Sequence, residues 1–213
     1  MRITALEPAK KSGKHRLYTE EGFLCTLEDE VIAAHHIHAG AEVDSELLNA
    51  LDFSSQCCRA KQKAYYLLGY RDHTRKELFD KLCRTVSPQA AEWVCNLLEE
   101  QRYLNDEACA QKLAAYYVRT KKMGQRRAVY ELLRRGINEE MARQAILSIG
   151  ADPVMQICEI IFKKYTHLLD GDYKNRSKLV AALVRRGYSF DDVRAAIDRY
   201  PEWEEEQEEE QEE

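Results

Sequence analysis

The spacing of hydrophobic residues predicts a helical protein from residue 52 onward. Residues 106–149 show the pattern most clearly, because apolar side chains recur there every three or four positions in three successive stretches. Gly124 separates the first stretch from the second. Gly136 follows two arginines at the end of the second, where glycine commonly terminates a helix. Residues 106–149 therefore predict a unit of three helices.

The same unit recurs on both sides of this stretch. The segment LLRRGINEE at residues 132–140 corresponds to LVRRGYSFD at residues 183–191, which lies 51 positions later. The first unit differs, since Arg84-Thr85-Val86 stands where the others have Arg-Arg-Gly. A repeat of about 50 residues is typical of helical repeat proteins, in which neighbouring units bury one another's faces. We expect a mainly α protein with three tandem three-helix repeats in an elongated, curved array, at residues 52–103, 104–150 and 151–200.

Helix starts are marked by residues that accept hydrogen bonds from free backbone amides. Thr74 is followed three positions later by Glu77, which fits a capping box, and Ser87 precedes a proline at the first helical position. Asn138 and Ser189 stand at the corresponding positions of later helices. These caps predict where four of the helices begin.

The two ends of the chain differ from the repeats. Residues 1–51 contain short alternating runs at 2–6, 15–19, 23–27 and 31–34, which predict a small antiparallel β-rich segment. A short helix at 44–51 is expected before a long helix at 54–70. Pro201 is expected to end the last helix, and the nine glutamates of residues 201–213 predict a disordered acidic tail.

Charge is distributed unevenly along the chain. The net charge of −5 combines −4 in residues 1–51, +8 in residues 52–200 and −9 in residues 201–213. The repeats are therefore basic, which favours a polyanion or an acidic protein surface as partner. No run approaches the length of a membrane span and no signal peptide is evident, so we expect a cytoplasmic protein without membrane contact. We also expect it to be a monomer.

The sequence lacks the usual signatures of an enzyme. The seven cysteines form no C-x-x-C, and neither a glycine-rich phosphate loop nor H-E-x-x-H occurs. His35, His36 and His38 have no further ligand at a suitable spacing, so we expect neither a metal site nor a cofactor. We predict a protein that is not an enzyme.

Basic residues at the bends and along the helix faces of the repeats are the candidate binding residues, together with Tyr116, since only Tyr117 fits the buried stripe of that helix. Exposed arginine and lysine are also the ordinary content of a solvated helix face, and arginines in a last turn are explained by the helix dipole alone. The candidate set comprises Arg71, Arg75, Lys76, Tyr116, Arg119, Lys121, Lys122, Arg126, Arg127, Arg134, Arg135, Lys174, Arg176, Lys178, Arg185 and Arg186.

Three motifs in this order resemble the RecX family of recombination regulators. They are R-x-x-T-R-x-E-L-x-x-K-L at residues 71–82, L-N-D-x-x-x-A with a later Y-V-R at 104–119, and G-x-R-R-x-x-x-E-L-x-x-R-G-I at 124–137. The resemblance covers roughly residues 55–200, and the segment before it is similar to the N-terminal extension of the longer members. The acidic tail is not part of the family pattern.

The resemblance implies a bacterial protein that binds the RecA recombinase filament on DNA, in the groove of that filament. It also implies modulation, usually inhibition, of RecA's ATP hydrolysis and strand exchange in homologous recombination, DNA repair and the SOS response. Single- or double-stranded DNA is a second partner that the resemblance allows. Two alternatives stay open: a sequence-nonspecific DNA-binding repeat protein that acts without RecA, and a scaffold that binds proteins alone.

Overall fold

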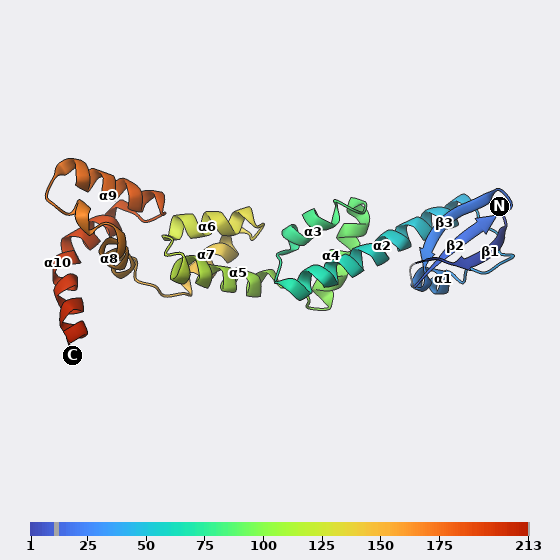
Figure 1. Ribbon diagram of the computed structural model, residues 1–213, viewed down its shortest axis with the longest axis horizontal. Helices are drawn as coiled ribbons and strands as arrows, with labels where there is room; N and C mark the ends of the chain where they lie inside the picture. The colour runs from blue at the N-terminus through green and yellow to red at the C-terminus, as the bar shows by residue number, and fades with distance from the viewer. Residues whose placement is uncertain (11–12, 213) are drawn as a thin grey trace. The chain divides into compact units, whose positions relative to one another are not determined.

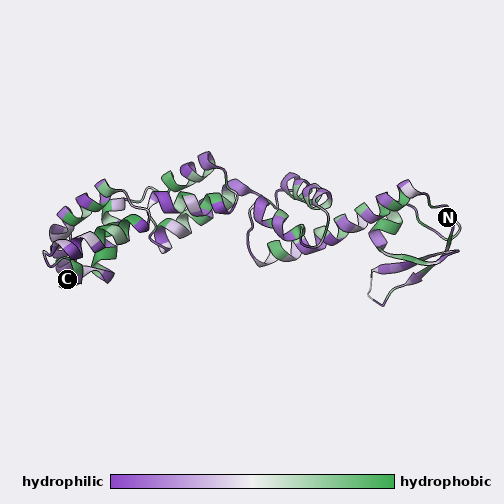
Figure 2. Ribbon diagram, turned by 90° about the horizontal axis from the view of Figure 1, so that it is seen from above, coloured by the Kyte–Doolittle hydropathy of each residue, from purple (hydrophilic) through white to green (hydrophobic). Residues whose placement is uncertain are grey.

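The structure is a computed structural model that describes residues 1–10 and 13–212. The chain divides into two compact units, Met1–Asn105 and Asp106–Glu213, which are described separately. Helices predominate in both units, as predicted, and a three-stranded sheet lies at the N-terminus (Figure 1). In Figure 2 hydrophobic and hydrophilic residues alternate along the helices, as expected for helices that bury one face.

The N-terminal sheet is antiparallel, in the order β1 (Ile3–Pro8), β2 (Lys14–Thr19) and β3 (Gly22–Glu28). Its buried face packs on helix α2 through Ile3, Leu17 and Leu27. A hydrogen bond also joins the sheet to that helix, because Glu28 accepts from the Ser55 hydroxyl of α2 at 2.6 Å. The same carboxylate pairs with Lys14 of the neighbouring strand at 2.7 Å. The predicted small antiparallel sheet is confirmed.

The prediction of a strand at residues 31–34 was wrong, since these residues belong to helix α1 (Asp29–Ala34). A strand there would bury alternate side chains, but Val31 is buried while Ala33 and Ala34 are exposed. The acidic residues Asp29 and Glu30 occupy the first turn, where carboxylates stabilise the positive end of the helix dipole. Four apolar residues were too few to separate the two periodicities.

Helix α2 (Ser45–Tyr70) is continuous where two helices were expected. The side chain of Asp44 caps it by accepting from the Leu47 amide at 2.7 Å. Its first half packs on the sheet through Leu51, which is 1% exposed, and its second half packs on α4 through Ala60 and Ala64. The predicted boundary after residue 51 therefore falls inside one helix that serves both cores.

The first repeat consists of the end of α2 with α3 (Arg75–Leu82) and α4 (Pro88–Glu100). The Thr74 hydroxyl accepts from the Glu77 amide at 3.2 Å, and the Ser87 hydroxyl accepts from the Ala90 amide at 3.4 Å. Both predicted caps are confirmed. The core of the repeat contains Leu78, Leu82, Ala91, Val94, Cys95 and Leu98, which recur at helical spacing on α3 and α4.

The second repeat contains α5 (Asp106–Ala115), the π-helical turn η1 (Tyr116–Thr120), α6 (Gln125–Arg134) and α7 (Glu139–Leu147). The π turn was not predicted. Its wider hydrogen bond, from the Lys121 amide to the Tyr116 carbonyl at 3.0 Å, adds one residue to the turn. Both Tyr117 and Val118 are buried as a result, while Tyr116 stays exposed. Asn138 caps α7 as predicted, accepting from the Met141 amide at 2.8 Å.

The third repeat contains α8 (Pro153–Lys164), the 3₁₀ turn η2 (Thr166–Leu168), α9 (Tyr173–Arg185) and α10 (Phe190–Glu212). The Ser189 hydroxyl accepts from the Asp192 amide at 3.0 Å and donates to the Asp192 carboxylate at 2.6 Å, which confirms this predicted capping site. The core contains Ile157 and Ile161 of α8, Leu179 of α9, and Val193 and Ala196 of α10.

The C-terminus differs from the prediction, because α10 continues through Pro201 to Glu212 in place of a helix end and a disordered tail. The cause is Trp203, which is 5% exposed and packs edge-on against Phe162 of α8, with ring centroids 5.8 Å apart. Tyr200 also contacts the Trp203 ring and donates to Glu204 at 2.8 Å. Burial of one large aromatic side chain offsets the amide hydrogen bond that proline cannot make.

Candidate basic interface

Two glycines bring the second and third repeats into backbone contact. Gly124 precedes α6 and Gly187 follows α9. A Cβ on Gly124 would lie 2.5 Å from the Gly187 carbonyl oxygen, and a Cβ on Gly187 would lie 2.5 Å from the Cβ of Arg127. Any larger residue would force the two backbones apart, so glycine is required at both positions.

The contact is fixed by hydrogen bonds between helix ends. The amides of Gly124 and Arg126 donate to the carbonyls of Arg186 and Gly187, at 2.9 and 3.3 Å. Free amides at the start of α6 thereby meet the carbonyls that follow α9, so each helix end satisfies the other. The side chain of Arg127 also reaches the Arg185 carbonyl, at 3.5 Å.

A buried polar chain lies behind this contact. The Gln156 amide donates to the Val118 carbonyl at 3.2 Å, and the Tyr188 hydroxyl lies 3.1 Å from the Gln156 side-chain oxygen and 3.2 Å from the Lys122 carbonyl. Burial raises the pKa of Tyr188, which keeps this hydroxyl neutral and able to donate. The second and third repeats are therefore held in one fixed geometry.

This geometry gathers basic side chains from both repeats into what we call the junction cluster. Two adjacent cavities of about 240 and 430 Å³ share Lys121 and Arg186 in their walls. The other basic residues come from the loop before α6, the first turn of α6, and the ends of α8 and α9. The junction cluster consists of Lys121, Lys122, Arg127, Lys163, Lys164, Arg185 and Arg186.

Acidic side chains neutralise only part of the junction cluster. Lys122 pairs with Glu159 at 2.8 Å, and Arg127 lies 3.4 Å from Glu131. Within the described part of the chain, the other five members have no carboxylate partner. Like charges held together in hollows produce a concentrated positive potential, which attracts anions.

Some of these positive charges also stabilise the helices that carry them. Lys163 and Lys164 lie in the last turn of α8, and Arg185 lies in the last turn of α9. Cations there interact favourably with the negative end of the helix dipole. The same residues can therefore end a helix and present charge to a partner.

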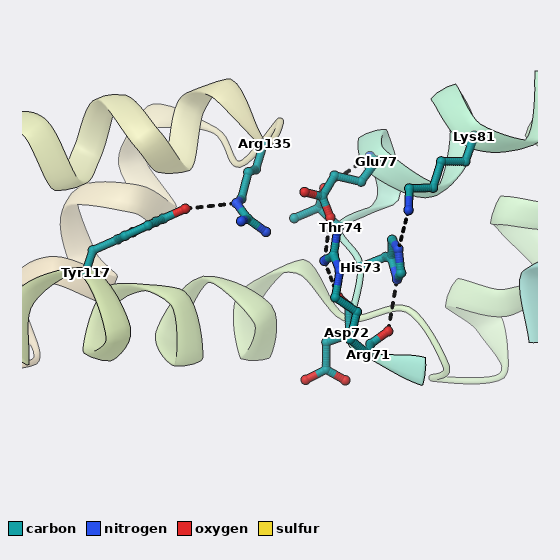
Figure 3. A network of polar contacts seen from close by, with 8 residues as sticks. All are labelled: Arg71, Asp72, His73, Thr74, Glu77, Lys81, Tyr117 and Arg135. Carbon is teal, nitrogen blue, oxygen red and sulfur yellow. Dashed lines mark hydrogen bonds and ion pairs between the residues drawn. The ribbon is translucent and has the colours of Figure 1, made fainter. Parts of the chain in front are cut away.

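The remaining candidates of the second repeat lie outside the cavities or at their edge. Arg119 and Arg126 are exposed, although Arg126 lines a separate small hollow at the repeat contact. Arg134 lies 3.4 Å from Glu131 and over the Tyr130 ring. Arg135 donates to the Tyr117 hydroxyl at 2.9 Å (Figure 3), so its guanidinium supports the packing of that buried ring.

Three candidates of the third repeat are separated from the junction cluster. Lys174, Arg176 and Lys178 lie in the first half of α9, whereas the cluster uses its opposite end. All three are exposed; Arg176 lies 3.6 Å from Asp198, and Lys178 donates to Asn175 at 3.1 Å. The structure therefore does not bring these residues together with Arg185 and Arg186.

Arg75 in the first repeat is engaged by the chain's own side chains. Its guanidinium contacts Glu92 at 2.6 Å, Asn96 at 2.6 Å and Glu99 at 3.1 Å, all on α4. The hydrogen bond that Arg75 donates to Glu92, followed by the one that it donates to Glu99, raises the pKa of Arg75 beyond its usual range. These contacts hold α3 against α4, so the geometry assigns Arg75 to packing.

The same repeat contains a polar network around the turn after α2 (Figure 3). Arg71 contacts Glu77 at 3.0 Å, while Lys76 is exposed. His73 is buried, with Nδ1 2.9 Å from the Arg71 carbonyl and Nε2 3.0 Å from the Lys81 ammonium. The carbonyl requires Nδ1 to donate and the ammonium requires Nε2 to accept, so the ring is the neutral Nδ1–H tautomer.

Sequence reasoning missed Lys163 and Lys164, although a signal was present. Adjacent basic pairs occur at 121–122, 163–164 and 185–186, each at or just after the end of a helix. The close approach of two glycines 63 positions apart then places these pairs around shared cavities. The basic pairs can be read from the sequence, but hydrophobic periodicity does not predict that they converge on one site.

The histidine-rich segment at residues 35–38 follows helix α1. His35 Nε2 lies 2.8 Å from the Ser54 hydroxyl, and no group of three metal-binding side chains is present among the described residues. In the same part of the chain, no helix has the length and apolar character needed to cross a bilayer.

Comparison with known proteins identifies the three repeats. Family models described as the first, second and third three-helix domains of RecX match residues 60–96, 105–146 and 154–197. The regulatory protein RecX of Clostridioides difficile (strain 630) is 23% identical over 200 residues, covering 92% of this chain and 94% of that protein. The regulatory protein RecX of Bacillus subtilis (strain 168) is 24% identical over 203 residues, covering 92% and 76%.

Solved structures show the same fold. A crystal structure of regulatory protein RecX superimposes with a TM-score of 0.71 at 19% identity, covering 92% of this chain and 98% of that one. RecX from Lactobacillus salivarius gives a TM-score of 0.63 at 21% identity, covering 70% and 98%. With three family domains in order and matches over most of its length, the chain belongs to the RecX family of regulatory proteins.

Proposed function

We propose that this protein regulates homologous recombination and DNA repair in the cytoplasm by binding the RecA–DNA filament in its groove. It modulates RecA's ATPase and strand exchange in the inhibitory direction, and it acts by binding, without a catalytic centre of its own. Membership of a regulatory family supports the class of function. The RecA partner follows from the motif resemblance at residues 71–82, 104–119 and 124–137.

The junction cluster is the observation that carries this proposal. Seven basic side chains from two repeats converge, and five of them have no carboxylate partner in the described part of the chain. A nucleoprotein filament offers what such a surface binds, namely phosphates and acidic side chains repeated along a groove. Because the two repeats are locked together at Gly124 and Gly187, the cluster needs no rearrangement before it binds.

The test is RecA's DNA-dependent ATPase with increasing amounts of the purified protein. We expect inhibition by the wild type, and a shift of about tenfold or more in the half-inhibitory concentration for the triple variant Lys163→Gln, Lys164→Gln and Arg185→Gln, because each exposed charge contributes up to about 1 kcal/mol. The matched control replaces Lys174, Arg176 and Lys178 by Gln, which removes the same charge from the other end of α9. Equal shifts for the two variants would contradict the assignment to the junction cluster.

The alternative function, nonspecific DNA binding without RecA, is favoured by the same positive potential. It predicts an affinity for DNA that falls steeply with salt, and no effect of the protein on RecA at salt concentrations that abolish DNA binding. RecA inhibition that persists under those conditions would exclude it.

A further inference from the structure

An exposed aromatic ring lies at the edge of the junction cluster. Tyr116 is 43% exposed, while its neighbours Tyr117 and Val118 are both buried. The π turn explains this arrangement, because its extra residue turns two successive side chains inward and leaves Tyr116 outside. The Tyr116 ring is therefore exposed to solvent beside the hydrophobic core and is not buried in it.

Lys121 connects this ring with the junction cluster. Its ammonium lies 5.3 Å from the centre of the Tyr116 ring, and the same side chain lines both basic cavities. The ring is supported from within, since Tyr117 packs 5.6 Å away and its hydroxyl is held by Arg135. Through Lys121, the exposed Tyr116 ring thus adjoins the unpaired cations of the junction cluster.

This pairing of chemistry selects a class of ligand. Phosphate groups can bind the cations, and an unpaired base can stack on the tyrosine ring, because any base can stack on an aromatic side chain. A duplex keeps its bases stacked inside and offers only phosphates to such a surface, while an acidic protein offers carboxylates but no flat aromatic partner of that kind.

We propose that Tyr116 and the junction cluster together bind single-stranded nucleic acid. One base stacks on the Tyr116 ring, and neighbouring phosphates lie against Lys121, Lys122 and the basic residues at the ends of α8 and α9. The Lys121 ammonium moves from the ring to a phosphate as the base arrives, since an exposed cation–π contact is weaker than base stacking. The inference rests on the proposed function for its setting, a filament formed on single-stranded DNA, but its test needs no RecA.

The test is fluorescence anisotropy with a labelled dT20 oligonucleotide and a labelled 20-base-pair duplex. Tyr116→Ala should weaken dT20 binding about tenfold, the loss expected for one stacked base, while Tyr116→Phe should retain it. Binding of the duplex should change less than twofold in both variants. Tyr173→Ala is the matched control, because this tyrosine is 83% exposed at the far end of α9 and should leave both affinities unchanged. Circular dichroism of each variant checks that the fold is retained.

Salt dependence tests the phosphate contacts independently of the ring. For single strands the slope of log affinity against log salt is about −0.7 for each neutralised phosphate, so Lys163→Gln with Lys164→Gln should reduce the slope by about 1.4. An unchanged dT20 affinity in Tyr116→Ala, or equal losses for dT20 and duplex, would overturn the base-stacking proposal. RecA inhibition without any dT20 binding at low salt would also overturn it while leaving the proposed function standing. If the wild-type protein binds dT20 but does not inhibit RecA, the proposed function alone is contradicted.

Discussion

The substitution Gly124→Ala should break the junction between the second and third repeats. The added methyl group would lie 2.5 Å from the Gly187 carbonyl oxygen, well inside van der Waals contact, and its other neighbours are also backbone atoms that no rotamer change can move. The backbone at Gly124 itself tolerates alanine, since its φ is −67° and its ψ is 160°. The cost is therefore one of packing between the repeats and not of local conformation.

The size of this effect follows from the contacts that must open. Separating the backbones removes the hydrogen bonds from Gly124 to Arg186 and from Arg126 to Gly187, each worth about 1 kcal/mol. Overpacking adds about 1–3 kcal/mol. We expect the free energy of unfolding of the Asp106–Glu213 unit to fall by about 3–5 kcal/mol.

Urea unfolding followed by tryptophan fluorescence measures this loss. The chain has two tryptophans, and Trp93→Phe leaves Trp203, which is buried in the Asp106–Glu213 unit, as the only probe. Gly69→Ala serves as the control, because nothing lies within 4 Å of its added methyl group in the last turn of α2. Since Gly69 belongs to the Met1–Asn105 unit, this change should leave the unfolding reported by Trp203 unaltered. A free energy of unfolding for Gly124→Ala within about 0.5 kcal/mol of the parent protein would refute the steric argument.

Two further substitutions test other parts of the structure. Burial lowers the pKa of His73 in the folded protein. Below the unfolded pKa of about 6.5, the unfolded chain therefore binds a proton that the folded ring does not bind. The Met1–Asn105 unit should lose stability as the pH falls from 7.5 to 5.5. Urea unfolding monitored at Trp93, in a Trp203→Phe background, checks this, and an equal pH dependence in His73→Gln would contradict it. Trp203→Ala should destabilise the Asp106–Glu213 unit by about 3–5 kcal/mol and reduce the helical signal in circular dichroism; unchanged helicity would show that α10 extends without this anchor.

Features set by neighbouring residues could be predicted from the sequence. The caps at Thr74, Ser87, Asn138 and Ser189 depend on contacts within three positions, and all four are present. The buried stripes of the repeats follow from helical spacing in the same way. Local chemistry was sufficient to identify the repeats and most of their helix starts.

Features set by distant residues could not be predicted. The continuity of α2 depends on two cores that meet at successive cysteines, Cys57 and Cys58, and the extension of α10 depends on Phe162, which lies 41 positions before Trp203. In the sequence, the proline and the glutamate-rich composition predicted that the last helix would end and a disordered tail would follow. In the structure, burial of the tryptophan side chain extends the helix instead.

The same distinction applies to the candidate site. Lys121, Lys122, Arg127, Arg185 and Arg186 were identified one by one as basic residues near helix ends, and the structure brings them together. Lys163 and Lys164 complete the cluster only because the repeats meet at two glycines. Arg75 was a candidate by its charge, yet carboxylates 17 and 24 positions away engage its guanidinium.

The proposed action of the junction cluster on RecA is tested most directly by the rate of DNA-dependent ATP hydrolysis by RecA. The rate is measured with the wild-type protein, with Arg126→Ala and Arg127→Ala combined, and with the triple cluster variant at Lys163, Lys164 and Arg185. We expect saturable inhibition by the wild type, and a reduced effect of both variants without loss of helical structure. An ATPase rate that saturating wild-type protein leaves unchanged would contradict the account.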